Sequence, residues 1–346
     1  MNPLERLTYD VTQAARRSWF LGNYLLAARM TGPLLPRERV PEHLPDRDEL
    51  LGDLRALFAR DRANIQAGFY LPPHDMLVSP LEVLRRSRLF FDDLRRVHRR
   101  RREGEHQEVF EARRDEGEGY PRYYLQNFHY QSDGWLSDRS AELYDYQVEV
   151  LFNGGADAMR RQALVPLHHH LKGRRIAECR LLDVACGTGR FLTFVKQNYP
   201  RLPVVGLDLS PNYLGKARQN LAPWSWVELQ QGKAEELPFE DASFDVVSCV
   251  YLFHELPREV RRRAAVEFAR VLRPGGRALF VDSIQYGDKA EYDGLIDFFP
   301  LAYHEPYYAD YARTDLPALF ADAGLEHEGS HRAFMSKAVV LRKPEG

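Results

Sequence analysis

Two acidic residues and a glycine-rich loop carry the clearest chemistry in this chain. The stretch LLDVACGTGR, residues 181–190, ends a short apolar run with Asp183 and then leaves the main chain bare at Gly187 and Gly189. Asp208 ends the next apolar run, VVGLD. Glycines let a cofactor approach the backbone closely, and an acid after the second strand accepts hydrogen bonds from the hydroxyls of an unphosphorylated ribose. The pattern therefore predicts a cofactor that contains a nucleoside.

Two other glycine-rich loops do not match this one. A phosphate-binding P-loop ends in Gly-Lys-Ser or Gly-Lys-Thr, whereas this chain reads Gly189-Arg190-Phe191. A dinucleotide-binding loop needs a third small residue three places after Gly189, and Leu192 occupies that place. The loop therefore matches neither of these two ligand classes.

The sequence around the loop predicts the sheet that must position it. After Arg180, short apolar runs alternate with helical patterns, which is typical of a parallel sheet covered by helices on both faces. We therefore expect a Rossmann-like α/β domain, whose ligands bind beyond the carboxyl ends of the strands. The expected strands are 181–184, 203–209, 226–230, 244–250, 277–283, 326–333 and 334–343, and the expected helices are 191–199, 212–221, 258–272 and 317–324.

Four blocks in this half of the chain resemble a known family. They read, in order, DVACGTGR, VVGLDLS, GKAEELPFEDASFDVVSCVYLFHEL and RVLRPGGRALFVD. Together they resemble class I S-adenosylmethionine-dependent methyltransferases, most of all the branch that contains the ubiquinone and menaquinone C-methyltransferases. The resemblance covers residues 178–285 strongly. It implies S-adenosylmethionine as the cofactor and a mostly parallel sheet whose last strand is antiparallel.

The resemblance also implies roles for ten residues. Four of them would shape the turn under the methionine part of the cofactor: Asp183, Ala185, Gly187 and Gly189. Asp208 would hold the ribose, with Leu209 beside the adenine. The adenine edge would be approached by Ala234 and Glu235, and the methionyl amine would be bordered by Cys249 and Val250.

Two positions depart from the family pattern. Ala185 replaces the first glycine of the usual loop, which we expect the chain to tolerate because the backbone there is not left-handed. Lys233 stands where relatives commonly carry an acid that bonds the adenine amine. That contact would then come from the main chain or from Glu235.

Methyl transfer requires alignment of donor and acceptor, and it requires a base only where the acceptor must lose a proton. His254, just past the fourth strand, is the candidate base because an unperturbed imidazole titrates near neutrality; the alternative is a packing or capping role. Tyr144 occupies the place where relatives have a lid over the cofactor. Tyr307, Tyr308 and Tyr311 either line a pocket or lie on a surface loop.

The N-terminal part is predicted to be helical. Apolar residues at three-and-four spacing favour helices from Leu4 to about Gly32, from Asp46 to Gly68, and from Pro80 onward. We expect three regions: a helical domain at 1–118, an aromatic-rich lid or connecting segment at 119–175, and the cofactor-binding domain at 176–346.

The third predicted helix runs into six arginines between Arg95 and Arg102, and an acidic stretch at 103–118 follows. Because the neighbouring charges nearly cancel, we interpret this region as a solvated helix end and linker. The alternative is a basic patch for RNA or an anionic membrane. Two alternative functions accordingly stay open: an RNA or protein methyltransferase anchored by this run, and a non-catalytic binding module.

The acceptor is expected to be a small, lipophilic or aromatic molecule. The segment 120–152 is rich in aromatic residues with polar tips, which suit a pocket wall, and the resemblance favours quinone-like acceptors by analogy. Nucleic acid is not expected, because base methyltransferases usually carry an Asn or Asp, two prolines and an aromatic residue where this chain reads Ser248-Cys249-Val250-Tyr251. The formal net charge of −2 agrees with that expectation.

Cysteine and histidine usage sets further limits. Three irregularly spaced cysteines indicate a reducing compartment, so we expect the cytoplasm. No metal site is expected, because the consecutive residues His168–His170 cannot all face one ion on a regular element. The apolar run SWFLGNYLLAA is too short to span a bilayer but leaves peripheral membrane contact open. The oligomeric state is not determined by these patterns.

Overall fold

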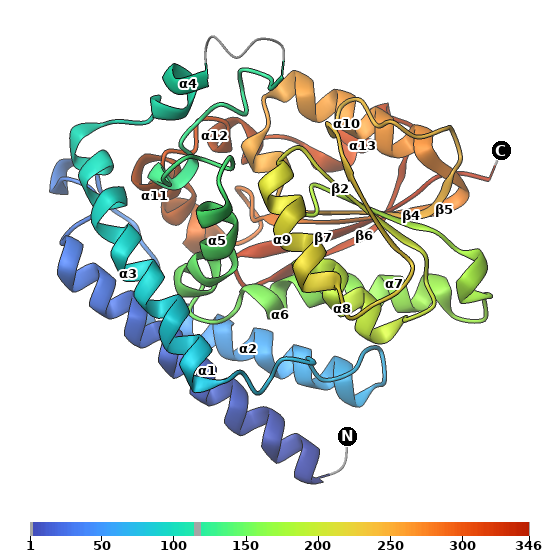
Figure 1. Cartoon of the computed structure of the whole chain (residues 1–346), viewed down its shortest axis with the longest axis horizontal. Coiled ribbons are helices and arrows are strands. Elements are labelled where there is room, and N and C mark those ends of the chain that lie inside the picture. The colour runs from blue at the N-terminus through green and yellow to red at the C-terminus, as the bar shows by residue number, and fades with distance from the viewer. Residues whose placement is uncertain (1–2, 114–118, 346) are drawn as a thin grey trace.

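Within the described residues, 3–113 and 119–345 of the computed structural model, seven strands form one sheet. They are β1 (Leu181–Val184), β2 (Val204–Asp208), β3 (Val227–Gln231), β4 (Phe244–Val250), β5 (Leu272–Ser283), β6 (Glu326–Ala333) and β7 (Ser336–Arg342). Their order across the sheet is β3-β2-β1-β4-β5-β7-β6 (Figure 1). Strands β1 to β5 are parallel, and β7 is antiparallel to β5 and β6. The predicted sheet with an antiparallel last strand is confirmed.

Helices cover both faces of the sheet. They include α7 (Leu164–Leu171), α8 (Arg190–Asn198), α9 (Pro211–Leu221), α10 (Arg258–Val271) and α13 (Leu316–Asp322). α7 and α8 lie on one face, and α10 and α13 lie on the other (Figure 1). Leu181 packs in the cluster with Phe194 and Leu182 in the cluster with Phe268, although they are adjacent in the chain. Successive strand residues point to opposite faces, so a strand buried on both sides must be apolar throughout.

The order in which strands are added to the sheet reverses direction at β1. β2 and β3 follow on one side of it, whereas β4 and β5 lie on the other side. The connections that follow β1 and β4 therefore diverge, and a crevice opens beyond the carboxyl ends of these two strands. The glycine-rich loop follows β1 at this crevice.

The N-terminal residues form α1 (Pro3–Thr31), α2 (Arg47–Gln66), α3 (Pro80–Glu103) and α4 (Glu108–Arg113). The first three correspond to the predicted helices, and the Asp46 side chain caps α2 by accepting a hydrogen bond from the Glu49 N–H at 2.7 Å. α1 and α3 pack against each other and against α5 (Asp138–Leu151), which precedes the sheet in the chain (Figure 1). No helix among residues 3–113 and 119–345 combines the length and apolar character needed to cross a membrane.

Shorter elements connect these parts. They are η1 (Arg37–Arg39), η2 (Phe128–Tyr130), α6 (Ala156–Arg160), η3 (Arg161–Ala163), η4 (Ile176–Glu178), η5 (Phe253–Glu255), η6 (Ala290–Tyr292), α11 (Asp293–Tyr303) and α12 (Tyr308–Tyr311). η5 follows β4, so its residues lie at the same crevice as the glycine-rich loop.

The arginine run at the end of α3 is not uniformly solvated, which corrects the interpretation made from the sequence. Arg100 is 4% exposed and donates hydrogen bonds to Glu108 and Ser132. Arg101 lies over the rings of Tyr130 and Tyr303. Spacing along one helix turns some of the consecutive cations inward, so charge counting alone could not separate them. Residues 114–118 of the neighbouring acidic stretch lie outside the described part of the chain.

Candidate active site

A cavity of about 770 Å³, open space at its mouth included, lies beyond the carboxyl ends of β1, β2 and β4. Six of the ten residues assigned to the cofactor line it: Ala185, Gly187, Asp208, Leu209, Ala234 and Val250. They come from four separate segments that the parallel sheet brings to one edge. The loop after β1 forms the floor of this cavity.

Asp208 anchors the loop at the end of β2. Its two carboxylate oxygens accept hydrogen bonds from the main-chain N–H groups of Gly187 and Ser210, each at 2.8 Å. A carboxylate oxygen has two lone-pair sites, so each oxygen keeps one acceptor position for a ligand. Burial raises the pKa of Asp208 to about 6, against the lowering effect of the backbone N–H groups.

Asp183, near the end of β1, and Gly189, at the end of the loop, do not line the cavity. Asp183 is 2% exposed and accepts a hydrogen bond from the Ser248 hydroxyl at 2.6 Å, which links the ends of β1 and β4. Burial raises its pKa to about 7. A Cβ atom on Gly189 would come within 2.8 Å of the Leu221 side chain, so this glycine permits close packing of the loop on α9.

The backbone at Ala185 contradicts the expectation of an ordinary conformation. Its φ is 57°, in the left-handed region that favours glycine. Hydrogen bonds from the Cys186 N–H to the Leu207 carbonyl at 2.9 Å and from the Gly189 N–H to the Cys186 carbonyl at 2.8 Å hold the turn in this shape. The turn geometry therefore persists despite the change from glycine to alanine, at a cost of roughly 1 kcal/mol.

Two residues assigned to the cofactor point elsewhere. Glu235 accepts a hydrogen bond from the Tyr123 hydroxyl at 2.7 Å and does not line the cavity. Cys249 is 1% exposed and belongs to the core. Lys233 does line the cavity, and its Nζ lies 3.8 Å from the carboxylate of Glu236.

Aromatic side chains cover the cavity from the segment that precedes the sheet. Trp135 and Tyr144 meet edge to face with their ring centroids 5.5 Å apart, and each lies 5.6 Å from the ring of Tyr213. Tyr124 and Phe128 also line the cavity. The aromatic composition of 120–152 signalled such a wall, whereas Tyr213, from α9, had no signal in the sequence.

His254 does not line the cavity, although its neighbour Glu255 does. The Nδ1 atom of His254 lies 2.5 Å from a carboxylate oxygen of Asp282, at the end of β5. Burial lowers the pKa of His254, but Asp282 outweighs that effect and raises it to about 10. The imidazole is therefore charged near pH 7 and held by an acid, which favours the packing role over that of a base.

A second cavity of about 950 Å³, its open mouth included, lies between α1, α3 and α5. Its walls are mostly apolar and include Ala28, Leu94, Val97 and Leu151. Tyr144 lines both cavities, so its ring stands between them. The sequence did not predict this second cavity.

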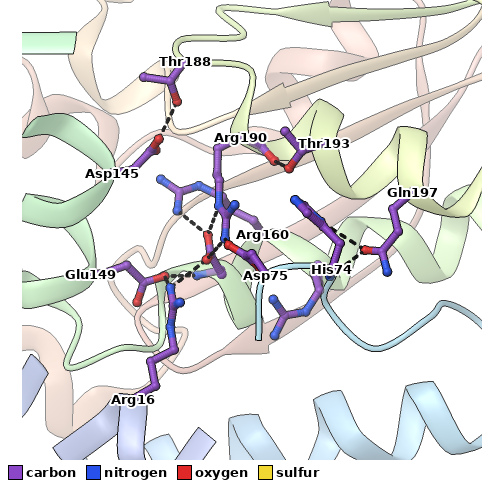
Figure 2. Close-up of polar contacts among 12 residues, drawn as sticks. Arg16, His74, Asp75, Asp145, Glu149, Arg160, Thr188, Arg190, Thr193 and Gln197 are labelled. Atoms are coloured by element: carbon purple, nitrogen blue, oxygen red, sulfur yellow. Dashed lines mark hydrogen bonds and ion pairs between the residues drawn. The ribbon is translucent and has the colours of Figure 1, made fainter. Parts of the chain in front are cut away.

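Polar contacts connect the loop to the helical part of the chain (Figure 2). The Thr188 hydroxyl donates a hydrogen bond to Asp145, the residue after Tyr144, at 2.7 Å. Arg190, which begins α8 after the loop, donates to Asp75 at 2.6 Å and to Asp157 at 2.5 Å. The loop is therefore held from α5, from α6 and from the segment that follows α2.

Comparisons with known proteins agree with this geometry. The family model described as a methyltransferase domain matches residues 181–276. The chain is 36% identical to a demethylmenaquinone methyltransferase of Deinococcus radiodurans over 143 residues, 41% of this chain and 56% of that protein. It is 31% identical to a demethylmenaquinone methyltransferase of Thermotoga maritima over 164 residues, 47% of this chain and 67% of that protein.

A third relative has a different acceptor in its name. A fatty-acid O-methyltransferase of Mycolicibacterium smegmatis is 30% identical over 181 residues, 51% of this chain and 58% of that protein. The chain thus spans little more than half the length of the Deinococcus and Mycolicibacterium relatives.

Proposed function

Because this chain belongs to the class I S-adenosylmethionine-dependent methyltransferases, we propose that it transfers a methyl group from S-adenosylmethionine to a small lipophilic acceptor. The observation that carries the proposal is the pair of cavities on either side of Tyr144. One has the polar floor that a nucleoside cofactor needs, and the other has the apolar walls that a lipophilic molecule needs.

The residues of the first cavity fit S-adenosylmethionine. Asp208 keeps one acceptor position on each oxygen, which matches the two hydroxyls of a ribose. A Cβ atom on Gly187 would meet nothing closer than 4.0 Å, so space remains over the bare backbone of the loop. Leu209 and Leu256 supply apolar contact for an adenine ring.

The second cavity supports a lipophilic acceptor. Its walls come from the long helices α1, α3 and α5, and they are mostly apolar. The relatives named above act, by their names, on demethylmenaquinone and on fatty acids, both of which have extended apolar parts. Apolar surface removed from water by these walls supplies binding energy at about 25 cal/mol per Å².

The bound cofactor supplies an electrophilic methyl group on a sulfonium. The chain's own contribution is to hold donor and acceptor in line and to exclude water, which makes the transfer effectively unimolecular. Tyr144 stands at the boundary between the cavities and contacts Trp135 and Tyr213, whose rings close the wall around it. No covalent bond to the protein is needed.

The cofactor part is tested by calorimetric titration of the purified chain with S-adenosylhomocysteine. Asp208→Asn keeps one acceptor oxygen and loses the charge, so we expect at least about tenfold weaker binding. Asp322→Asn, at an exposed position at the end of α13, is the matched control and should bind normally. Equal affinity in both variants contradicts the role of Asp208, and no binding by the folded wild type contradicts the proposed function.

The acceptor part is tested with S-adenosylmethionine labelled in its methyl group and two probes, a demethylated naphthoquinol and a long-chain fatty acid. Ala28→Trp fills the second cavity from α1 and should abolish labelling while S-adenosylhomocysteine still binds. Leu25→Trp changes an exposed residue of the same helix outside the cavity wall and should label normally. Absence of label in both probes with the wild type refutes this acceptor class and leaves the cofactor site standing.

The alternatives have less support. A nucleic-acid or protein anchor at Arg95–Arg102 would lack two of the six arginines of the run, because Arg100 is buried and Arg101 stacks on tyrosines. A non-catalytic module would not need a second cavity beside the cofactor cavity. We also propose a cytoplasmic location, which the three buried, unpaired cysteines support.

A further inference from the structure

Three residues from distant parts of the chain converge beside Tyr144. They are His129 in η2, Glu255 in η5, and Glu305 in the segment between α11 and α12. One ligand atom from each, an imidazole nitrogen or a carboxylate oxygen, lies within 4.8 Å of the other two. Glu255 lines the first cavity and His129 lines the second. The cluster therefore lies where the two cavities meet.

Glu305 is the residue whose surroundings demand an explanation. Its side chain is 0% exposed, and neither carboxylate oxygen has a hydrogen-bond partner among residues 3–113 and 119–345. The Nε2 atom of His129 lies 3.0 Å from one of these oxygens, but the contact is not aligned as a hydrogen bond. A buried carboxylate without donors is costly, so a cation or a proton must compensate it.

The surrounding charges do not supply that compensation. The imidazole of His254 is already held by Asp282 at 2.5 Å, and its Nε2 atom lies 3.8 Å from Glu255. Asp282 also accepts a hydrogen bond from the Phe253 N–H at 2.7 Å. A carboxylate oxygen of Glu255 therefore lies within 4.8 Å of one of Glu305 and of a ring nitrogen of His129.

We propose that His129, Glu255 and Glu305 bind a divalent transition-metal ion whose open coordination positions face the junction of the two cavities. With bonds of about 2.1 Å, two neighbouring ligands lie about 3.0 Å apart around an octahedral ion and about 3.4 Å apart around a tetrahedral one, and the 3.0 Å separation of His129 and Glu305 lies close to both values. One imidazole and two carboxylates suit zinc, manganese or iron, whereas calcium and magnesium prefer oxygen ligands alone.

A metal ion at this site would lie at the junction of the two cavities, where it could orient the acceptor. An acceptor held in the second cavity would bring its reacting oxygen to the open positions of the ion, which would orient it toward the methyl group in the first cavity. This part rests on the proposed function, whereas metal binding itself does not. The three residues also differ from His168–His170, for which no common ion was expected.

The test is a titration of the chelator-treated full chain with zinc chloride and, separately, with manganese chloride. We expect one ion per chain, and we expect Glu305→Gln to weaken binding by about 100-fold because it removes a charged ligand. His129→Gln, which changes a side chain 25% exposed, should weaken it as well. His169→Gln is the matched control, because this exposed residue of the histidine run is where adventitious metal would bind.

Each result of this titration either supports or overturns the metal site. Binding that is absent, or that is equal in wild type and Glu305→Gln, overturns the proposal and leaves a proton as the compensating charge. Binding that His169→Gln removes is adventitious and overturns it too. S-adenosylhomocysteine binding is measured in every variant. It shows that the variant is folded, and it separates the proposed metal site from the proposed methyltransferase function. Cofactor binding without metal refutes the metal site alone, and metal binding without cofactor refutes the proposed function alone.

Discussion

Replacing Asp157 with asparagine removes the negative charge on which three arginines converge below the glycine-rich loop. Asp157 is 4% exposed and lies 2.8 Å from Arg16, 3.1 Å from Arg160 and 2.5 Å from Arg190. Figure 2 shows these arginines approaching from α1, α6 and the start of α8. They belong to parts of the chain that are far apart in the sequence, so the carboxylate links the helical part to the cofactor loop.

The expected cost follows from the burial of this cluster. Removing one partner of a buried ion pair costs about 3–5 kcal/mol, because the remaining charge stays buried without compensation. Arg190 keeps Asp75 at 2.6 Å and Arg16 keeps Glu149 at 2.8 Å, so we expect the lower end, about 3 kcal/mol. Affinity for S-adenosylhomocysteine should fall too, because Arg190 directly follows the loop.

The assay is urea unfolding followed by tryptophan fluorescence, with calorimetry for the ligand. Glu178→Gln is the control, since its pair with Arg175 has side chains 66% and 84% exposed and should contribute less than about 1 kcal/mol. A loss of unfolding free energy below about 1 kcal/mol for Asp157→Asn would contradict the role of this buried network as a link between the helical part and the loop.

The pH dependence gives a second check on the same residue. Burial raises the pKa of Asp157, but Arg190 and Arg16 outweigh it and hold the pKa well below its usual range. A lowered folded pKa means that the stabilisation is present above the unfolded pKa, about 3.9, and is lost as the pH falls below it. The difference in unfolding free energy between wild type and Asp157→Asn should therefore be constant from pH 7 to about pH 5 and shrink below about pH 4.

Three other outcomes are expected. Burial raises the pKa of Asp208 to about 6, so affinity for S-adenosylhomocysteine should fall by about tenfold per pH unit below that value. Calorimetry that finds the same affinity at pH 5 and pH 8 contradicts the role of this carboxylate. Ala185→Gly should raise the unfolding free energy by about 0.5 kcal/mol, because φ is 57° at this position. Ala222→Gly, at φ −51°, should lower it by about 0.5–1 kcal/mol. If urea unfolding shows changes of the same sign for both variants, the backbone strain at Ala185 is contradicted. Tyr144→Phe should keep the transfer rate within about twofold, whereas Tyr144→Ala should lower kcat about tenfold by merging the cavities and admitting water; equal rates would remove Tyr144 from the boundary.

Local patterns were sufficient to predict the sheet and its loop. Leu181 and Leu182 are both fully buried, on opposite faces, and a strand of this kind is recognised from neighbouring residues alone. Asp208 was predicted at the end of a strand and is the last residue of β2, whereas Asp183, predicted likewise, is the penultimate residue of β1. Strand length, apolar runs and glycine turns are properties of short segments, so no distant partner is needed to recognise them.

Local patterns did not predict the direction of the Glu235 side chain or the backbone conformation of Ala185. Glu235 was predicted at the adenine edge but turns to Tyr123, 112 positions earlier in the chain. Ala185 was expected to have an ordinary backbone, but hydrogen bonds of the turn hold it in the left-handed region. The Glu235 side chain is oriented by Tyr123 from another segment, and the Ala185 backbone is held by hydrogen bonds within the folded turn. The type of a residue does not reveal such contacts.

Short sequence patterns are sufficient to predict the sheet, the loop after β1, the acid at the end of β2 and, through these, the family and its cofactor. The second cavity between α1, α3 and α5, and the meeting of His129, Glu255 and Glu305, become visible only in the folded chain. This difference follows from the range of the interactions. Hydrophobic periodicity acts between neighbours in the chain, whereas a cavity or a cluster is made by helices and loops whose mutual packing no single segment encodes.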